Sequence, residues 1–253
     1  MRKIYDLSVP TEDSPSEPIP LKVEHKDHLV SLPIMEMFLG GKKDDYADGL
    51  GWADDALSLG AHSGTHVDAP WHYSPTSEGK KARTIDEMPL DWFFHDGVVL
   101  DMRHKESGSG ITVDDVKKAL QKIKYTLKPW DIVMIETGAD KLWGKAEYFN
   151  AGSGMTAEST LWLIDHGCKV MGIDAWGWDR PFIKIKEEYD RTKNKELLWT
   201  AHKAGIKKEY CHIEKLANLD KLPRPFGFQV ACFPVKITGG SAGWARVVAI
   251  FES

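Results

Sequence analysis

The sequence of 253 residues predicts an α/β fold with a mixed β-sheet. In the middle of the chain, short apolar runs typical of buried strands alternate with segments of helical periodicity. Towards the end of the chain, strand-like runs dominate. Strands that alternate with helices favour parallel pairing, whereas strands that follow one another directly favour antiparallel pairing. Both kinds of pair are therefore expected in one sheet. We find no internal repeat and no composition break, and therefore expect residues 1–253 to form a single domain.

The expected strands are short and mostly apolar. In chain order they cover residues 3–9, 56–61, 97–101, 131–136, 169–174, 210–213, 227–237 and 244–252. Residues 56–61 alternate between apolar and small or polar side chains, as a half-buried strand does.

Three helices are expected between these strands. Thr112 supplies a hydroxyl N-cap, followed by acidic residues in the first turn of a helix. Thr156 caps a second helix, which Gly167 ends. A third helix is expected over residues 196–204, with its end at Gly205.

Residues 10–54 are expected to form a long arm or lid. Five prolines interrupt any periodicity there. A loop of this length in a compact domain is usually a functional lid or an exchanged arm. Its apolar segment, residues 32–39, would cover a pocket or pack on a neighbouring subunit.

Composition excludes several classes of function. The net charge of −5 gives no sign of a polyanion-binding surface, so nucleic acid is not an expected partner. No apolar run approaches the length of a membrane span, and the first residues lack the apolar stretch of a signal peptide. The three cysteines are scattered without Cys-x-x-Cys spacing, which favours a reduced, cytoplasmic setting.

The most informative stretch is His62-Ser-Gly-Thr-His66-Val-Asp68-Ala-Pro-Trp-His72. It places three of the ten histidines and a carboxylate within eleven residues that contain no Lys or Arg. Imidazole and carboxylate bind Zn, Mn and Fe, and imidazole also transfers protons near neutral pH. The stretch therefore predicts a metal centre with a proton-transfer group beside it. The alternative is three ordinary loop or core histidines.

The spacing within this stretch assigns roles. His62 and His66 would share one face of a helix, but a glycine, a proline and β-branched residues favour an irregular loop leaving a strand. In an extended segment His66 and Asp68 point to the same side and can share one ion. Three protein ligands leave positions open for water and substrate, as a catalytic site requires. His72 is then a natural general base or acid.

The pattern His-x-Gly-Thr-His-x-Asp-x-Pro-x-His resembles the signature of the cyclase family of metal-dependent hydrolases. That family includes bacterial kynurenine formamidases, isatin hydrolases and lactone or polyketide cyclases. Residues 210–223 resemble a second family segment, and residues 228–250 are similar to the closing hairpin of the isatin-hydrolase-like branch. The resemblance implies a swivelling β/β/α fold with a small barrel-like sheet.

The resemblance also implies further site residues. His202, twelve residues before Glu214, stands where binuclear formamidases carry a histidine for a second metal. If Asp68 bridges, His202 and Glu214 could hold a second ion. With one ion, Glu214 could instead orient water or a ligand imidazole. The cofactor is thus Zn or Mn, as one or two ions.

Five residues are candidates for substrate binding. Trp71, Trp176 and Trp178 could form a wall for a flat aromatic substrate, although core packing accounts for them equally well. Gln229 and Ser241 lie in the closing strands, where the isatin-hydrolase-like branch places polar groups that position a carbonyl or relay protons. Ordinary strand hydrogen bonding is the alternative for these two residues.

The predicted function is metal-dependent hydrolysis of an amide, formamide or lactam bond in a small, aromatic substrate. Water activated by the metal would attack, with His72 as general acid or base. A lactone hydrolase or cyclase on the same site, or a non-catalytic metal-binding protein, are the alternatives. The long arm and the habit of the family suggest a homodimer or homotetramer.

Overall fold

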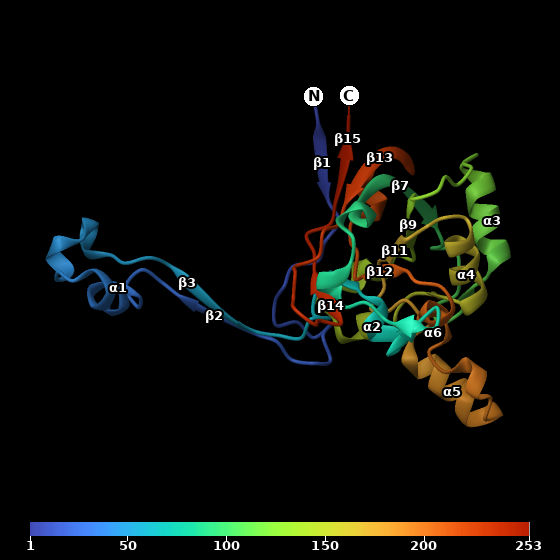
Figure 1. Cartoon of the computed structure of the whole chain (residues 1–253), viewed down its shortest axis with the longest axis horizontal. Coiled ribbons are helices and arrows are strands. Elements are labelled where there is room, and N and C mark those ends of the chain that lie inside the picture. The colour runs from blue at the N-terminus through green and yellow to red at the C-terminus, as the bar shows by residue number, and fades with distance from the viewer. Residues whose placement is uncertain (253) are drawn as a thin grey trace. The chain divides into compact units, whose positions relative to one another are not determined.

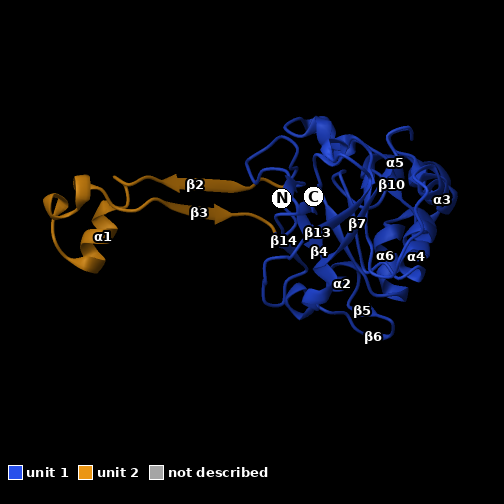
Figure 2. Cartoon of the chain, turned by 90° about the horizontal axis from the view of Figure 1, so that it is seen from above, with its two compact units in different colours: residues 1–18, 61–253 blue, residues 19–60 orange. Residues whose placement is uncertain are grey.

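The computed structural model describes residues 1–252, which fall into two compact units (Figure 2). Unit 1 comprises Met1–Pro18 and the chain from Ala61 onward, and unit 2 comprises Ile19–Gly60. The arm was predicted over residues 10–54, whereas unit 2 covers Ile19–Gly60, so both boundaries differ from the prediction. The single-domain organisation stays a prediction.

Unit 1 is built on one mixed sheet of nine strands that curls into a half-barrel (Figure 1). The strand order is β1-β15-β13-β7-β9-β11-β12-β4-β14. The four strands from β7 to β12 are parallel, and every other neighbouring pair is antiparallel. The predicted α/β class with a mixed sheet is therefore confirmed. The strands are β1 Lys3–Asp6, β4 His66–Asp68, β7 Phe94–Asp101, β9 Ile132–Glu136, β11 Val170–Ile173, β12 Cys211–Glu214, β13 Phe226–Ala231, β14 Ala242–Trp244 and β15 Val248–Phe251.

Five helices belong to unit 1: α2 Pro70–Tyr73, α3 Val113–Lys122, α4 Ala157–Asp165, α5 Phe182–Thr192 and α6 Thr200–Lys207. The predicted caps are confirmed, because the hydroxyl oxygens of Thr112 and Thr156 accept hydrogen bonds from the third residue of their helices. Helix α5 was not predicted from the sequence. Its many polar residues and the proline directly before it mask the helical periodicity of its sequence.

The prediction that the third helix ends at Gly205 is wrong. Helix α6 continues to Lys207, and residues 195–197 form a separate 3-10 turn. A Cβ atom at Gly205 would overlap the ring of Tyr73. Gly205 therefore lets α6 pack closely on α2 and does not end the helix.

Strands β9 and β11 are apolar except for Glu136 at the end of β9, because both faces of the sheet are covered. Alternate residues enter two different core clusters, so that Val98 packs on the side of α3, α4 and α6, whereas Val99 packs on the opposite side. The short elements of unit 1 connect this framework. They are β5 Thr76–Ser77, β6 Lys80–Lys81, β8 Gly110–Ile111, β10 Gly154–Met155 and the 3-10 helices Ile85–Glu87, Leu90–Phe93, Ala139–Leu142, Ala146–Asn150, Lys195–Leu197 and Leu219–Lys221.

Unit 2 is a two-stranded antiparallel ribbon that carries a helical tip. Its elements are β2 Lys22–Lys26, α1 Leu32–Leu39, the 3-10 turns Lys43–Asp45 and Ala47–Gly49, and β3 Asp54–Ser58. The strand expected over residues 56–61 is thus β3, and it pairs with β2 rather than with the main sheet. Throughout residues 1–252, no helix is long and apolar enough to cross a membrane.

Candidate metal centre

The register between two antiparallel strands assembles the centre. Asp68 on β4 lies opposite His212 on β12, and His66 lies opposite Glu214. Because side chains two residues apart in a strand share a face, these four side chains project from the same side of the sheet. Helix α6 brings His202 to this face. The predicted ligands, which lie up to 152 residues apart in the sequence, therefore meet at one place.

Three atoms form the first group of potential ligands. His62 Nδ1 lies 2.8 Å from Asp68 Oδ1, and His66 Nε2 lies 3.1 Å from the same oxygen. The two imidazole nitrogens are 3.3 Å apart. His66 Nδ1 donates a hydrogen bond of 2.9 Å to the carbonyl of Gly64, so in neutral His66 the lone pair of Nε2 faces Asp68. The loop prediction holds for His62 but is wrong for His66 and Asp68, which lie on strand β4; the extended conformation considered for these two residues is confirmed.

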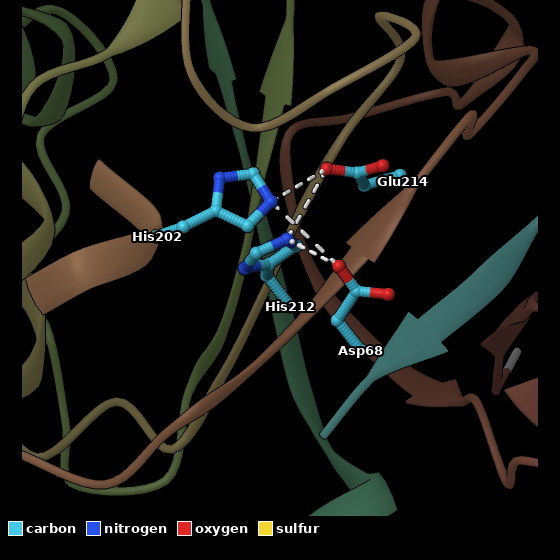
Figure 3. Close-up of side chains that lie close together, drawn as sticks. All are labelled: Asp68, His202, His212 and Glu214. Atoms are coloured by element: carbon cyan, nitrogen blue, oxygen red, sulfur yellow. Dashed lines mark hydrogen bonds and ion pairs between the residues drawn. The ribbon is translucent and has the colours of Figure 1, made fainter. Parts of the chain in front are cut away.

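Four atoms form the second group (Figure 3). His212 Nε2 lies 3.1 Å from Asp68 Oδ2 and 3.2 Å from Glu214 Oε1. His202 Nε2 lies 3.4 Å from Glu214 Oε1 and 3.7 Å from Asp68 Oδ2. The ligand atoms of this group all lie within 4.8 Å of one another. Asp68 thus presents one carboxylate oxygen to each group.

Asp68 provides the test of whether these residues suit a metal ion. Its side chain is 0% exposed, and neither carboxylate oxygen forms a hydrogen bond within residues 1–252. Burial alone would raise the pKa of Asp68, but the imidazoles of His72, His62 and His66 outweigh burial and hold that pKa well below its usual value. A buried carboxylate without hydrogen bonds is costly unless a cation compensates it. The donor set of imidazole nitrogens and carboxylate oxygens suits a divalent metal.

His72 stands at the edge of this centre. Ala69 and Pro70 start the short helix α2, which turns the chain back so that His72 Nε2 lies 3.6 Å from Asp68 Oδ2. Burial, together with positive charge on His62 and His202, lowers the pKa of His72 to about 4, although Asp68 opposes this. The His72 imidazole is therefore neutral at pH 7 and able to accept a proton.

Asp179 orients His202, and the sequence did not reveal it. One carboxylate oxygen accepts the backbone N–H of Ala201, and the other accepts both the backbone N–H of His202 and its ring Nδ1–H, the latter at 2.6 Å. Asp179 therefore fixes the start of α6 and, in neutral His202, leaves the lone pair of Nε2 facing the centre.

A buried ion pair supports the loop that carries His62. Lys215 Nζ lies 3.0 Å from both carboxylate oxygens of Glu17 and donates to the carbonyl of His62 at 2.7 Å. Glu17 also accepts the backbone N–H of Gly64 at 2.7 Å. This pair, too, was not found from the sequence, because its two residues lie 198 positions apart.

His212 is the main residue that sequence reasoning missed. The signal was present, because His212 lies in the strand predicted over residues 210–213 and precedes Glu214 by two residues, so that one further residue of strand places both side chains on the same face. His66 and Asp68 are related in the same way on the neighbouring strand β4.

The five residues predicted to bind substrate lie in different parts of the structure. Trp71 lies beside His72 on α2 and is 39% exposed, and Ser241 Oγ lies 3.0 Å from His62 Nε2. Trp176 packs its ring on Phe149 and Phe182.

The other two substrate candidates lie deeper or farther away. Trp178 is fully buried, donates its indole N–H to Thr160 and stacks on the ring of His212. Gln229 lies on β13, and strands β7, β9 and β11 separate it from β12. A role in substrate binding stays a prediction for all five candidates.

Comparisons with known proteins give consistent results. The sequence model of a family described as "Putative cyclase" matches residues 5–180. A kynurenine formamidase of Erythrobacter litoralis is 29% identical over 192 residues, which are 76% of this chain and 74% of that protein. An isatin hydrolase of Roseibium aggregatum is 27% identical over 214 residues, covering 81% of this chain and 77% of that protein.

Solved structures share the fold. Isatin hydrolase A from Ralstonia solanacearum superposes with a TM-score of 0.78 at 24% identity, covering 99% of this chain and 92% of that one. An isatin hydrolase bound to the product analogue thioisatinate gives a TM-score of 0.76 at 21% identity and covers 100% and 93% of the two chains.

Proposed function

The chain belongs to the putative cyclase family, and we propose that it is a metal-dependent hydrolase that opens an amide, formamide or lactam bond of a small aromatic substrate. The observation that carries this proposal is Asp68, whose two buried oxygens lack hydrogen bonds and face two separate groups of imidazoles. Relatives named kynurenine formamidase and isatin hydrolase support the bond type.

We propose that His62, His66 and Asp68 hold the catalytic ion, which is Zn or Mn because a mixed nitrogen and oxygen donor set suits both. Such an ion, when bound, polarises a carbonyl group and activates water near neutral pH. The side chain of His62 is 33% exposed, so this group of ligands can be reached from solvent.

We propose that His72 transfers the proton. Its Nε2 accepts a proton from the attacking water as the new C–O bond forms, and the same nitrogen donates that proton to the leaving nitrogen as the C–N bond breaks. Three observations support this role: the position of His72 beside Asp68, a side chain that is 27% exposed, and a pKa low enough to keep the imidazole neutral at pH 7.

Activity with defined substrates tests the proposal. The purified protein, loaded with Zn or Mn, is assayed with N-formylkynurenine, with isatin and with an aromatic lactone. Hydrolysis of N-formylkynurenine or isatin supports the proposal and identifies the type of bond that is cleaved. Hydrolysis of the lactone alone would indicate the alternative activity, lactone hydrolysis. Absence of stoichiometric Zn, Mn or Fe after metal-replete expression would overturn it.

A variant of His72 tests the proton-transfer role separately. We expect His72→Ala to retain the metal and lose about 100-fold or more in kcat. His104→Gln is the matched control, because His104 is exposed on a turn away from the centre. Full activity of His72→Ala would refute the role of His72 without affecting the metal assignment.

We further propose that the chain forms a homodimer or homotetramer in the cytoplasm. Helix α1 exposes adjacent apolar side chains, Met37, Phe38 and Leu39, each by about two thirds. An apolar patch of this kind marks a contact surface, and a second copy of the chain is the proposed partner. The three free, buried cysteines agree with a reducing compartment. Light scattering after gel filtration should show a dimer or tetramer, and Phe38→Asp should shift the mass towards the monomer.

A further inference from the structure

We infer that the apolar cavity between α5 and residues 198–199 is the binding site for the aryl group of the substrate, and that Trp199 is the wall shared by this cavity and the metal centre. This inference rests on the hydrolase function proposed above and deepens it, because it assigns the part of the substrate that is not cleaved to named residues. The five substrate-binding candidates from the sequence do not line this cavity.

The lining and size of the cavity suit a flat apolar group. Its volume is about 490 Å³, within the range of pockets that bind small molecules. Apolar and aromatic side chains dominate the lining, and two of them, Phe182 and Leu198, are exposed by 44% and 37%. An aryl ring that covers these side chains removes apolar surface from water, which favours binding. The lining residues are Phe182, Ile185, Lys186, Tyr189, Leu198 and Trp199.

Trp199 connects this cavity to the metal centre. Its ring stacks on that of His202, with the centroids 4.4 Å apart and the planes at 24°. It also meets the ring of His72 edge-on, at 5.2 Å and 87°. Because Trp199 lines the cavity as well, an aryl group bound there lies one residue away from the imidazole that is proposed to transfer the proton.

Local structure does not account for a tryptophan at this position. The backbone of Trp199 is left-handed, with φ 59° and ψ 43°, a conformation that bulky side chains rarely adopt. Trp199 is also the N-cap of α6 but its side chain makes no cap hydrogen bond, and Asp179 accepts the first free N–H groups instead. Glycine or asparagine would suit both the backbone and the cap better. A wall between the cavity and the metal centre does require the indole ring.

Phe182 extends the aromatic lining towards the segment that follows β11. Its ring packs edge-on against those of Trp176 and Phe149, with centroid distances of 5.6 and 6.2 Å. Trp176, which the sequence suggested as part of a wall for an aromatic substrate, thus contacts a residue of the cavity. The inferred wall is formed by Phe182 and Trp199, and Trp176 packs on it.

Paired substrates with and without an aryl group test this inference. The metal-loaded protein is assayed with formanilide and with N-methylformamide, which share the formamide bond and differ in the aryl group. Leu198→Asp places a carboxylate in the cavity, at a side chain exposed enough for the protein to fold. We expect its KM for formanilide to rise about tenfold or more, because an apolar ring would desolvate the charge. Its kcat should change by less than about threefold, since the cleaved bond lies elsewhere.

Variants of Trp199 test the shared wall. Trp199→Ala should raise KM for formanilide about tenfold or more and also lower kcat, because both the aryl group and the His72 ring lose a contact. Trp199→Phe keeps an aromatic ring and should restore most of both values. The change in KM with N-methylformamide should be much smaller, since this substrate has no aryl group.

Trp130→Ala is the matched control. Trp130 also has a left-handed backbone, with φ 75°, and its ring stacks on that of His95 at 5.3 Å. It lies just before the start of β9, at the amino ends of the parallel strands, whereas Glu214 lies at the carboxyl end of β12. Trp130→Ala should keep wild-type kinetic values with both substrates.

Binding to metal-free protein provides a measurement that does not depend on activity. Oxindole is titrated calorimetrically and compared with 2-pyrrolidinone, a lactam of the same ring size without the fused benzene ring. We expect wild-type protein to bind oxindole about tenfold or more tightly than 2-pyrrolidinone, and Leu198→Asp to lose most of this preference. Near-ultraviolet circular dichroism checks that each variant is folded, and if Trp199→Ala is not, Leu198→Asp decides.

The outcomes separate this inference from the function on which it rests. Wild-type KM for formanilide in both Leu198→Asp and Trp199→Ala would overturn the cavity assignment and leave the hydrolase proposal intact. Equal affinity of wild-type protein for the two lactams would also overturn the assignment. Absence of any hydrolysis by the metal-loaded protein, together with a preference for oxindole that Leu198→Asp abolishes, would instead refute the hydrolase and retain the cavity as an aryl-binding site.

Discussion

His212 lies directly opposite Asp68 across the antiparallel pair of β12 and β4, with its Nε2 3.1 Å from Asp68 Oδ2. The other oxygen of Asp68 faces His62 and His66 at 2.8 and 3.1 Å. One buried carboxylate therefore joins a local group of potential ligands, contributed by seven consecutive residues, to a group assembled from distant parts of the chain.

This bridging position predicts that loss of the Asp68 charge weakens metal binding by both groups of potential ligands. Asp68→Asn removes the negative charge and replaces one oxygen with a nitrogen that cannot bind metal. We expect the affinity for each ion to fall by more than about 100-fold, above the range for residues that only orient a ligand. Metal content after dialysis against a weak chelator measures this. Asp114→Asn, at an exposed aspartate of α3, is the control, and selective loss of one ion in Asp68→Asn would contradict a bridge.

Asp179 is expected to affect only an ion held by the second group of potential ligands, Asp68, His202, His212 and Glu214 (the second ion). Asp179→Asn weakens the hydrogen bond that holds His202 Nδ1 and so allows the ring to rotate or change tautomer. We expect about 10–100-fold weaker binding of the second ion and unchanged binding of the first. Calorimetric titration of the metal-free variant separates the two steps. Equal weakening of both steps would mean that Asp179 supports the whole fold rather than His202.

The sequence could predict the first group of ligands because those residues are local. His62, His66 and Asp68 lie within seven residues, and only the extended conformation of a short segment is needed to bring them together. The placement of His202 and Glu214 was also anticipated, but through a family resemblance. Their contact with Asp68 depends on the pairing of β12 with β4, which no local pattern specifies.

The residues that sequence reasoning missed act through tertiary contacts. Asp179 meets His202 only because α6 packs near the end of a connection from β11, and Glu17 meets Lys215 across almost the whole chain. The end of α6 was predicted wrongly because glycine has a low intrinsic helix propensity, so Gly205 was expected to stop the helix. Its actual role is to make room for Tyr73.

The buried pair of Glu17 and Lys215 predicts a strong dependence of stability on both partners. The side chains are exposed by only 4% and 1%. Glu17→Gln leaves the Lys215 ammonium buried without a countercharge, and the free energy of unfolding should fall by about 3–5 kcal/mol. Urea denaturation measures this loss. In the double variant Glu17→Gln/Lys215→Met no buried charge remains, so it should be more stable than Glu17→Gln alone. If it is less stable, the pair is not the source of the effect.

Asp174 predicts how stability changes with pH. Its buried carboxyl accepts hydrogen bonds from Thr137 and Gly138, but burial dominates and raises its pKa to about 7. Because the pKa is higher in the folded state than in the unfolded state, the folded state retains the proton over a wider range of pH. The stabilising contribution is therefore complete below about pH 4 and is lost as the pH rises through 7.

The size of this effect follows from the two pKa values. Between pH 5 and pH 8 the contribution of Asp174 should fall by about 3 kcal/mol, at 1.36 kcal/mol for each pKa unit crossed. The quantity to measure is the difference in free energy of unfolding between wild type and Asp174→Asn, obtained by urea denaturation at both pH values. Metal release and other titrations affect both proteins equally and cancel in that difference. The difference in free energy of unfolding between wild type and Asp174→Asn should favour wild type less at pH 8 than at pH 5. The corresponding difference for Asp114→Asn should be the same at both pH values. A difference for Asp174→Asn that stays constant or grows towards pH 8 would show that hydrogen bonds to the carboxylate outweigh its burial.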